Sequence, residues 1–176
     1  MPAPINPELF YVAYERFLID VETLAHALER DSWRPDFLVG VGRGGLVPAA
    51  YLSHRTQIPM LSVDHSSGEA GFADELLSKL AAKSRGGTRI LTVDDINDSE
   101  STITHLRTAI VKQGGVQDRV RVAVLVNNIR SGAKAHYSAD EIDRDSDKRW
   151  FGFPWEAGAK PAALIEDALS VPERLA

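Results

Sequence analysis

Residues 90–102 read ILTVDDINDSEST, and this stretch decides how the remainder of the chain is interpreted. It opens with apolar residues typical of a buried strand, which we expect at 89–93, and continues with the adjacent carboxylates Asp94 and Asp95. Apolar residues then recur at helical spacing over 101–113, where glycines end the pattern. A buried strand that passes directly into a helix is the repeating unit of a parallel sheet.

The same alternation extends on both sides of this stretch. We expect further strands at 36–41, 59–64 and 120–126 and further helices at 18–30, 44–55, 74–82 and 160–176, while 11–17 fits a short strand or the start of the first helix. Together these elements predict one domain over residues 1–176, of the α/β class, with a parallel twisted sheet and helices on both faces. The proline-rich residues 1–8 are expected to be flexible.

Composition narrows the class of protein. The chain has 176 residues, is 44% hydrophobic and carries a net charge of −5, as expected for a single domain without a basic field to attract nucleic acid or a membrane surface. It has no cysteine, which excludes disulfides and thiolate metal sites, and no apolar run of the ~20 residues that span a bilayer. The first eight residues, MPAPINPE, lack the pattern of a signal peptide, so we expect a cytoplasmic protein.

The segment 65–87 separates two predicted strands and differs from the rest of the chain. It has glycine and serine near both ends and holds a short predicted helix at 74–82. Connections of this length are often functional lids, so we expect 65–87 to be mobile and to cover a site. His65 stands near a strand end, and we interpret it as a turn residue rather than a catalyst.

A glycine-rich turn, GVGRGG at 40–45, follows the first predicted strand and admits three interpretations. Gly40, Gly42 and Gly45 match the dinucleotide-binding fingerprint G-x-G-x-x-G. Alternatively, Arg43 and the consecutive backbone N–H groups form a pocket for a phosphate or diphosphate. The turn also fits a tight strand-to-helix connection that needs glycine only for its geometry.

The residues after the 89–93 strand give a stronger signal. The adjacent carboxylates Asp94 and Asp95 can accept hydrogen bonds from vicinal hydroxyls or bind Mg²⁺. Free N–H groups at the start of the following helix, together with the hydroxyls in 98–102, suit a phosphate. One short segment can thus hold a sugar by its diol and by its phosphate, whereas capping of a helix and of turns explains only one or two of these residues.

Three motifs resemble one family and occur in that family's order. The stretch 90–102 resembles the phosphoribosyl diphosphate signature of the type I phosphoribosyltransferases, and FLVGVGRGGLVPA at 37–49 resembles the pyrophosphate loop of their purine-salvage members. WFGFPWE at 150–156 is similar to the base-binding segment of the xanthine/guanine/hypoxanthine enzymes. The resemblance covers about residues 11–156 and implies a small base-binding hood, with 127–156 as the base-binding segment.

The resemblance implies an enzyme that transfers a 5-phosphoribosyl group from phosphoribosyl diphosphate to a purine base, with Mg²⁺ as cofactor. It implies that Asp98 is catalytic and moves a proton at N7 of the base. Phosphoribosyl diphosphate would be bound by Asp94, Asp95, Asp98, Ser99, Glu100, Ser101 and Thr102, and its pyrophosphate by Gly42, Arg43, Gly44 and Gly45. The base would be bound by Asn128, Trp150, Phe151 and Glu156, and the metal by Asp94, Asp95 and Glu156.

Within the base-binding segment, the resemblance implies that Trp150 stacks on the purine and that the backbone of Phe151 contacts its edge. Core packing is the expected role of Phe153 and Trp155, because it is the common fate of aromatic residues. The resemblance also implies a cis peptide bond directly before Arg43.

Two positions depart from the family pattern. Glu100 stands where the phosphate loop usually has glycine, so its side chain must point away from the phosphate. Relatives place a lysine after the strand at 120–126 to bind the exocyclic oxygen of the purine, but here that place holds Asn127 and Asn128. Arg130 can substitute only from a distance, which leaves a base other than a 6-oxopurine open.

Two other classes of function remain alternatives. One is a non-catalytic regulator that binds phosphoribosyl diphosphate, although the acidic charge argues against a nucleic-acid partner. The other is an oxidoreductase built on the glycine-rich turn, which fits the short chain poorly and leaves 93–102 unexplained. The expected partners are therefore phosphoribosyl diphosphate and a nucleobase, without nucleic acid or membrane, in a homodimer or homotetramer as the resemblance implies.

Overall fold

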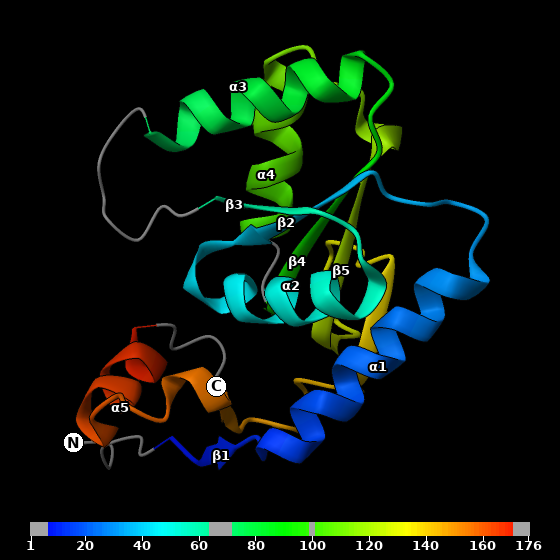
Figure 1. The fold of residues 1–176 in the computed structure, drawn as a ribbon. Coiled ribbons are helices and arrows are strands. Elements are labelled where there is room, and N and C mark those ends of the chain that lie inside the picture. The colour runs from blue at the N-terminus through cyan, green and yellow to red at the C-terminus, as the bar shows by residue number, and fades with distance from the viewer. Residues whose placement is uncertain (1–6, 64–71, 99–100, 171–176) are drawn as a thin grey trace.

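The structure is a computed structural model that describes residues 7–63, 72–98 and 101–170, with 72–74 and 101–102 described by their backbone only. A five-stranded parallel sheet forms its centre (Figure 1). The strands are β2 (Phe37–Val41), β3 (Met60–Val63), β4 (Ile90–Asn97), β5 (Val120–Asn128) and β6 (Tyr137–Ile142), in the order β3-β2-β4-β5-β6. Because all four pairings are parallel, the carboxyl ends of the strands meet at one edge, where such sheets bind ligands.

Helices cover both faces of the sheet. They are α1 (Tyr14–Arg30) and α2 (Gly42–Thr56) on one face, and α3 (Phe72–Arg85) and α4 (Ser101–Lys112) on the other (Figure 1). Successive residues of a strand point to opposite faces, so Leu91 packs with α1 and α2 while Ile90 packs with α3 and α4. Both faces of β4 are therefore apolar, as is usual for a parallel sheet that is covered twice.

A smaller parallel pair of strands forms a hood, which comprises β1, β7, η2 and α5. Their bounds are β1 (Leu9–Tyr11), β7 (Trp150–Gly152), the 3₁₀ helix η2 (Pro154–Glu156) and α5 (Pro161–Leu169). β1 pairs with β7 so that Leu9 lies opposite Trp150, and β1 and α5 lie at the lower left of Figure 1. This pairing places β1 beside β7, which belongs to the predicted base-binding segment. A further 3₁₀ helix, η1 (Gln117–Arg119), leads into β5.

The predicted fold class is confirmed, with corrections to individual elements. β4 and β5 continue to Asn97 and Asn128, several residues beyond their predicted ends, and β1, β6 and β7 were not predicted as separate strands. The first helix begins at Tyr14 rather than at residue 18, and Phe17 is buried whereas Leu18 is exposed. In the described part of the chain, no helix is both long and apolar enough to cross a membrane.

Candidate active site

The start of α2 lies directly against the carboxyl end of β4. A Cβ atom built on Gly44 would lie 2.3 Å from Oδ2 of Asp95, and one built on Gly45 would lie 2.0 Å from the carbonyl oxygen of Val93. At Gly45 the neighbour is backbone and cannot move aside, so only glycine permits this approach, whereas a side chain at position 44 would have to displace the Asp95 carboxylate. The glycine-rich turn that carries Arg43 is thereby brought to the acidic pair.

A cavity of about 320 Å³ occupies the space beyond this contact. It is lined by Val41, Gly42, Gly44, Asp94, Asp95, Ile96, Trp150, Phe151, Phe153 and Glu156. A second cavity of about 660 Å³ shares Gly44, Asp95 and Glu156 with the first and adds Arg43 and part of α5. The structure therefore gathers residues of all three predicted motifs, which are far apart in the sequence, around one cleft.

The acidic pair lies within β4 rather than after it, and alternation along a strand would point the two side chains to opposite faces. Both nevertheless line the cleft. The pairing of β2 with β4 ends at Gly40 and Val93, so the next residues of β4 have no paired strand on that side. Oδ1 of Asp94 accepts a hydrogen bond from the backbone N–H of Asp95 at 3.0 Å, which turns the carboxylate toward the cleft side of the strand.

The two aspartates of the cleft both have a raised pKa, and burial is the main cause. Burial raises the pKa of Asp95 to about 6, and the negative charge of Glu156 adds to this effect. Burial and the charge of Asp95 raise the pKa of Asp94 well above its usual value. In the described part of the chain, no ion pair neutralises either aspartate. Such a cluster is suited to hold a cation or hydroxyl groups, both of which stabilise ionised carboxylates.

Asp98 lies in a different environment from the acidic pair. It is buried, and Nε and NH2 of Arg144 donate hydrogen bonds of 2.6 and 2.7 Å to its two carboxylate oxygens. Ser99 and Glu100, which were assigned to the same phosphate loop, lie outside the described residues, and Ser101 and Thr102 are described only as the first backbone turn of α4. The structure therefore describes only the two ends of the predicted phosphate loop.

The side chains predicted to replace the lysine of relatives do not face the cleft. The Asn128 amide donates to the carbonyl oxygen of Asp98 at 3.0 Å and accepts from the backbone N–H of Arg130 and of Arg144. The Arg130 guanidinium is exposed and makes two 3.0 Å hydrogen bonds to Asp143. Arg144 is instead the cation beside Asp98, and sequence reasoning missed it because it stands in the charged segment DRDSDKR, where no periodicity marks a buried residue.

The aromatic residues of the hood divide into two groups. Trp150 and Phe151 line the cleft from β7. Phe153 is buried and stacks on Trp155, with ring centroids 4.9 Å apart, and Trp155 also contacts the buried Phe17 at 5.4 Å. Core packing of Phe153 and Trp155 is thus confirmed. Phe153 also lines the smaller cavity, and Trp155 lines the larger one.

Two expectations about mobile or strained segments need correction. No peptide bond among the described residues is cis; the turn before Arg43 instead uses Gly42 with a φ of 58°. The second half of the expected lid is α3, whose Leu77 and Leu80 are buried in the core, so this part is a packed helix. The remainder of that segment, including His65, lies outside the described residues.

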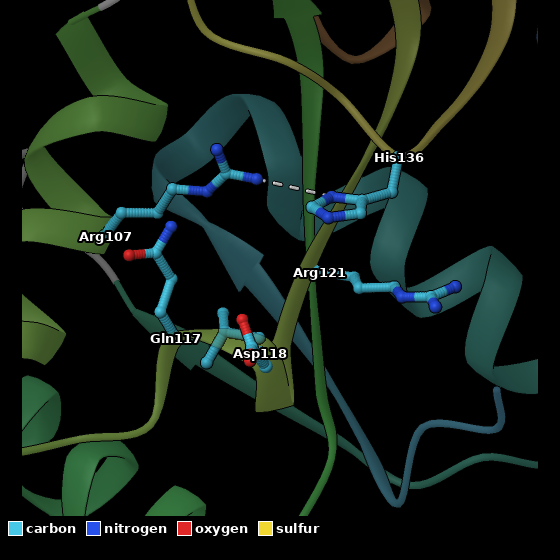
Figure 2. A pocket seen from close by; sticks show the side chains of 6 residues that line it. Arg107, Gln117, Asp118, Arg121 and His136 are labelled. Carbon is cyan, nitrogen blue, oxygen red and sulfur yellow. Dashed lines mark hydrogen bonds between the residues drawn. The ribbon is translucent and has the colours of Figure 1, made fainter.

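Another hollow of about 310 Å³ lies at the opposite edge of the sheet, where β5 begins (Figure 2). Nδ1 of His136 accepts hydrogen bonds from the backbone N–H of Val122 at 3.1 Å and from Arg107 at 3.4 Å. Burial, with the positive charge of Arg107 next in size, lowers the pKa of His136 to about 4, so the imidazole is neutral near pH 7. The neutral ring supports the start of β6 and takes no part in the cleft.

Comparisons with known proteins agree with this geometry. Residues 11–162 match the phosphoribosyl transferase domain family. A xanthine-guanine phosphoribosyltransferase from Cereibacter sphaeroides is 27% identical over 156 residues, which cover 84% of this chain and 86% of that protein.

Solved structures share the fold at lower identity. A purine phosphoribosyltransferase from Pyrococcus horikoshii superposes with a TM-score of 0.61 at 22% identity, over 84% of this chain and 93% of that one. The xanthine-guanine-hypoxanthine phosphoribosyltransferase of Helicobacter pylori gives a TM-score of 0.64 at 21% identity, over 89% of this chain and 99% of that one. With a family match that spans most of its length, the chain belongs to the phosphoribosyl transferase domain family and is a transferase of that class.

Proposed function

We propose that the protein transfers the 5-phosphoribosyl group of phosphoribosyl diphosphate to a 6-oxopurine base, with a nucleoside monophosphate and pyrophosphate as products. The observation that carries this proposal is the close contact of Gly44 with Asp95, which joins the diphosphate-type turn and the acidic pair in one cleft. A diphosphate held by Arg43 and the N–H groups of the turn would then project its ribose toward the acidic pair.

In the proposed reaction, a ring nitrogen of the base forms a bond to the anomeric carbon, and the bond from that carbon to the pyrophosphate oxygen breaks. The electron pair of the broken bond leaves with pyrophosphate, while the base loses a proton from its N7 position. We assign Asp98 as the acceptor of this proton. Asp94 and Asp95 would accept hydrogen bonds from the ribose hydroxyls, which orients the sugar for attack.

The 5′-phosphate would lie at the start of α4, in the loop formed by Asp98, Ser99, Glu100, Ser101 and Thr102. α4 begins at Ser101, and the first N–H groups of a helix have no partner within the helix. These groups and the loop hydroxyls would neutralise part of the phosphate charge.

The base would lie between the acidic pair and β7. Trp150 lines the cleft there and offers a flat apolar surface on which a purine can stack, and the Phe151 backbone would contact the edge of the base. The choice of a 6-oxopurine rests on the relatives from Cereibacter sphaeroides and Helicobacter pylori, whose names include xanthine and guanine. Adenine is the informative competitor because it has an amino group in place of the exocyclic oxygen.

We propose Mg²⁺ as the cofactor, held by Asp94, Asp95 and Glu156 together with the substrate. Within the described residues, no group of three or more metal-binding side chains is already assembled. The ion would therefore take one or two of these carboxylates at a time and complete its shell with water and substrate phosphates. When bound, the ion would neutralise charge on the pyrophosphate as it leaves.

The test is to incubate the protein with phosphoribosyl diphosphate, Mg²⁺ and each nucleobase in turn, with pyrophosphate release as the readout. We expect release with guanine, xanthine or hypoxanthine and little with adenine. Release with adenine alone would overturn the assigned base class. Tight binding of phosphoribosyl diphosphate without release for any base would favour the non-catalytic regulator instead.

We further propose that the enzyme works in the cytoplasm, and that it forms a homodimer or homotetramer, as the family resemblance implies. Light scattering of the purified protein would measure the number of subunits, and a monomer at enzyme-assay concentrations would contradict the assembly.

A further inference from the structure

The proposed reaction does not account for the buried ion pair between Asp98 and Arg144. Asp98 and Arg144 are 7% and 8% exposed, and the guanidinium makes two short, parallel hydrogen bonds to the carboxylate. This fork fixes both the position and the plane of the carboxylate, which a single-point contact with an ammonium group could not do.

The guanidinium of Arg144 is itself held from the other side. Its NH1 group donates to the carbonyl oxygen of Asp147 at 3.0 Å and to that of Arg149 at 2.6 Å. The guanidinium carbon also lies 5.4 Å from the ring centre of Phe151. Arg144 is therefore anchored to the two carbonyls and the ring at the entrance to β7, independently of Asp98.

The backbone of Arg144 is tied to β5 as well. Its N–H donates to Oδ1 of Asn128 at 3.3 Å, and the amide group of the same asparagine donates to the carbonyl oxygen of Asp98. Arg144 and Asn128 thus connect the ends of β4 and β5 to the chain that enters β7, where Trp150 and Phe151 line the cleft. One side chain joins the proton acceptor to the wall on which the base would stack.

We propose that Arg144 is a positioning residue for base transfer: it aims the Asp98 carboxylate and, through its bonds to the chain before β7, sets the distance between that carboxylate and the base-stacking wall. This inference rests on the proposed function. Because Arg144 keeps its two carbonyl acceptors, it can stay in place while Asp98 takes up a proton from the base. The diphosphate end of the cleft, formed by Arg43, Gly44 and Asp95, has no part in this network.

The test compares Arg144→Lys and Arg144→Gln with the matched control Arg130→Gln. Arg130 makes the same forked contact to a carboxylate, Asp143, but on the surface and away from the cleft. We expect Arg144→Gln to lower kcat roughly 10- to 100-fold and to raise the KM for the base, since misplacement of a reacting group by about 1 Å has effects of this size. The Kd for phosphoribosyl diphosphate should change by less than about twofold, and the control should keep wild-type kinetics.

Arg144→Lys should recover little of the lost kcat, because an ammonium group keeps the charge but cannot form the fork. Since Arg144→Gln leaves Asp98 buried without a countercharge, folding is checked by circular dichroism, and the double variant Asp98→Asn with Arg144→Gln removes both charges together. If Arg144 acts through Asp98, the double variant should have the kcat of Asp98→Asn alone. Losses that multiply, or a parallel loss of phosphoribosyl diphosphate binding, would show a merely structural role and overturn the inference.

The two proposals fail in different ways. A wild-type protein without turnover on any base refutes the proposed function. A wild-type protein that turns over a base, beside an Arg144→Gln variant as active as Arg130→Gln, refutes the role of Arg144 alone.

Discussion

Asp94, Asp95 and Asp98 lie in one short stretch of sequence, but their side chains have different surroundings. The charge of Asp98 is matched by Arg144, whose two hydrogen bonds hold the carboxylate in one orientation. Asp94 and Asp95 have no such partner among the described residues, and burial raises the pKa of both. This stretch thus combines one carboxylate fixed by a guanidinium with two carboxylates that line the cleft and can receive hydroxyl groups or a cation.

Replacement of Asp98 by asparagine should separate binding from chemistry. The amide keeps the size of the side chain but cannot accept a proton from the base, so we expect turnover to fall by ~10²- to 10⁴-fold, the usual contribution of a general acid–base. Binding of phosphoribosyl diphosphate should be retained, and single-turnover kinetics together with calorimetry would measure the two effects. Turnover equal to that of the wild type would remove Asp98 from the mechanism.

Replacement of Asp95 by asparagine should stabilise the protein without ligands. Because the folded-state pKa of about 6 lies above the ordinary 3.8, stability from this group is present below pH 3.8 and is lost as the pH rises through 6. At pH 7 without Mg²⁺, the variant should therefore unfold with a free energy higher by about 1–3 kcal/mol, and its stability should fall less between pH 4 and 7. Urea denaturation across this range is the measurement, and a variant no more stable at pH 7 would contradict the account.

At the scale of elements, the cleft depends on how closely α2 approaches β4. A methyl group on Gly45 would lie 2.0 Å from the backbone carbonyl oxygen of Val93, and rotation of a side chain could not relieve this clash. We expect Gly45→Ala to push the start of α2 away from β4, to destabilise the fold by roughly 2–4 kcal/mol and to weaken phosphoribosyl diphosphate binding.

A glycine elsewhere provides the comparison for this variant. A Cβ on Gly86 would meet its nearest neighbour, the carbonyl oxygen of Lys83, at 3.3 Å, which a slight shift relieves. Gly86→Ala should therefore keep wild-type binding and stability to within about 1 kcal/mol. Thermal denaturation and calorimetry of the two variants would decide the matter, and equal behaviour of both would show that the close approach is dispensable.

At the scale of the whole molecule, the cleft lies between two separately built parts. The large sheet supplies the turn and the acidic pair, and the hood supplies Trp150, Phe151 and Glu156. A ligand that contacts both parts should stabilise the whole fold, by about 2.7 kcal/mol at a ligand concentration 100 times its Kd.

We therefore expect phosphoribosyl diphosphate with Mg²⁺ to raise the Tm of the wild-type protein by roughly 5–10 °C. The double variant Asp94→Asn with Asp95→Asn should show almost no shift, because the ribose and the metal lose their carboxylates. Thermal scans with Mg²⁺ alone provide the baseline. A full shift in the double variant would refute the assignment of the acidic pair.

The alternation of β2, β3, β4 and β5 with helices, and the motifs that meet at the cleft, could be predicted from the sequence alone. Apolar runs such as 120–126 have to be buried on both sides, so such strands are local features that the sequence shows. The glycine-rich turn at 40–45 was also visible, but its three interpretations stayed open until the structure showed Gly44 against Asp95 and Gly45 against the backbone of Val93. The short strands β1 and β7 are different, because three residues carry no periodicity. They become strands only by pairing with each other, and paired residues such as Leu9 and Trp150 are far apart in the sequence.

Which charged side chains are buried depends on contacts that form only in the folded molecule. Arg130 and Arg144 are the same residue type, and neither stands in an apolar pattern, yet Arg130 is exposed beside Asp143 and Arg144 is enclosed beside Asp98. A side chain's burial depends on which surfaces fold over it, and here the chain entering β7 closes over Arg144. For the same reason, the absence of a lysine could be seen in the sequence, whereas the cation that stands next to Asp98 could be found only in the folded molecule.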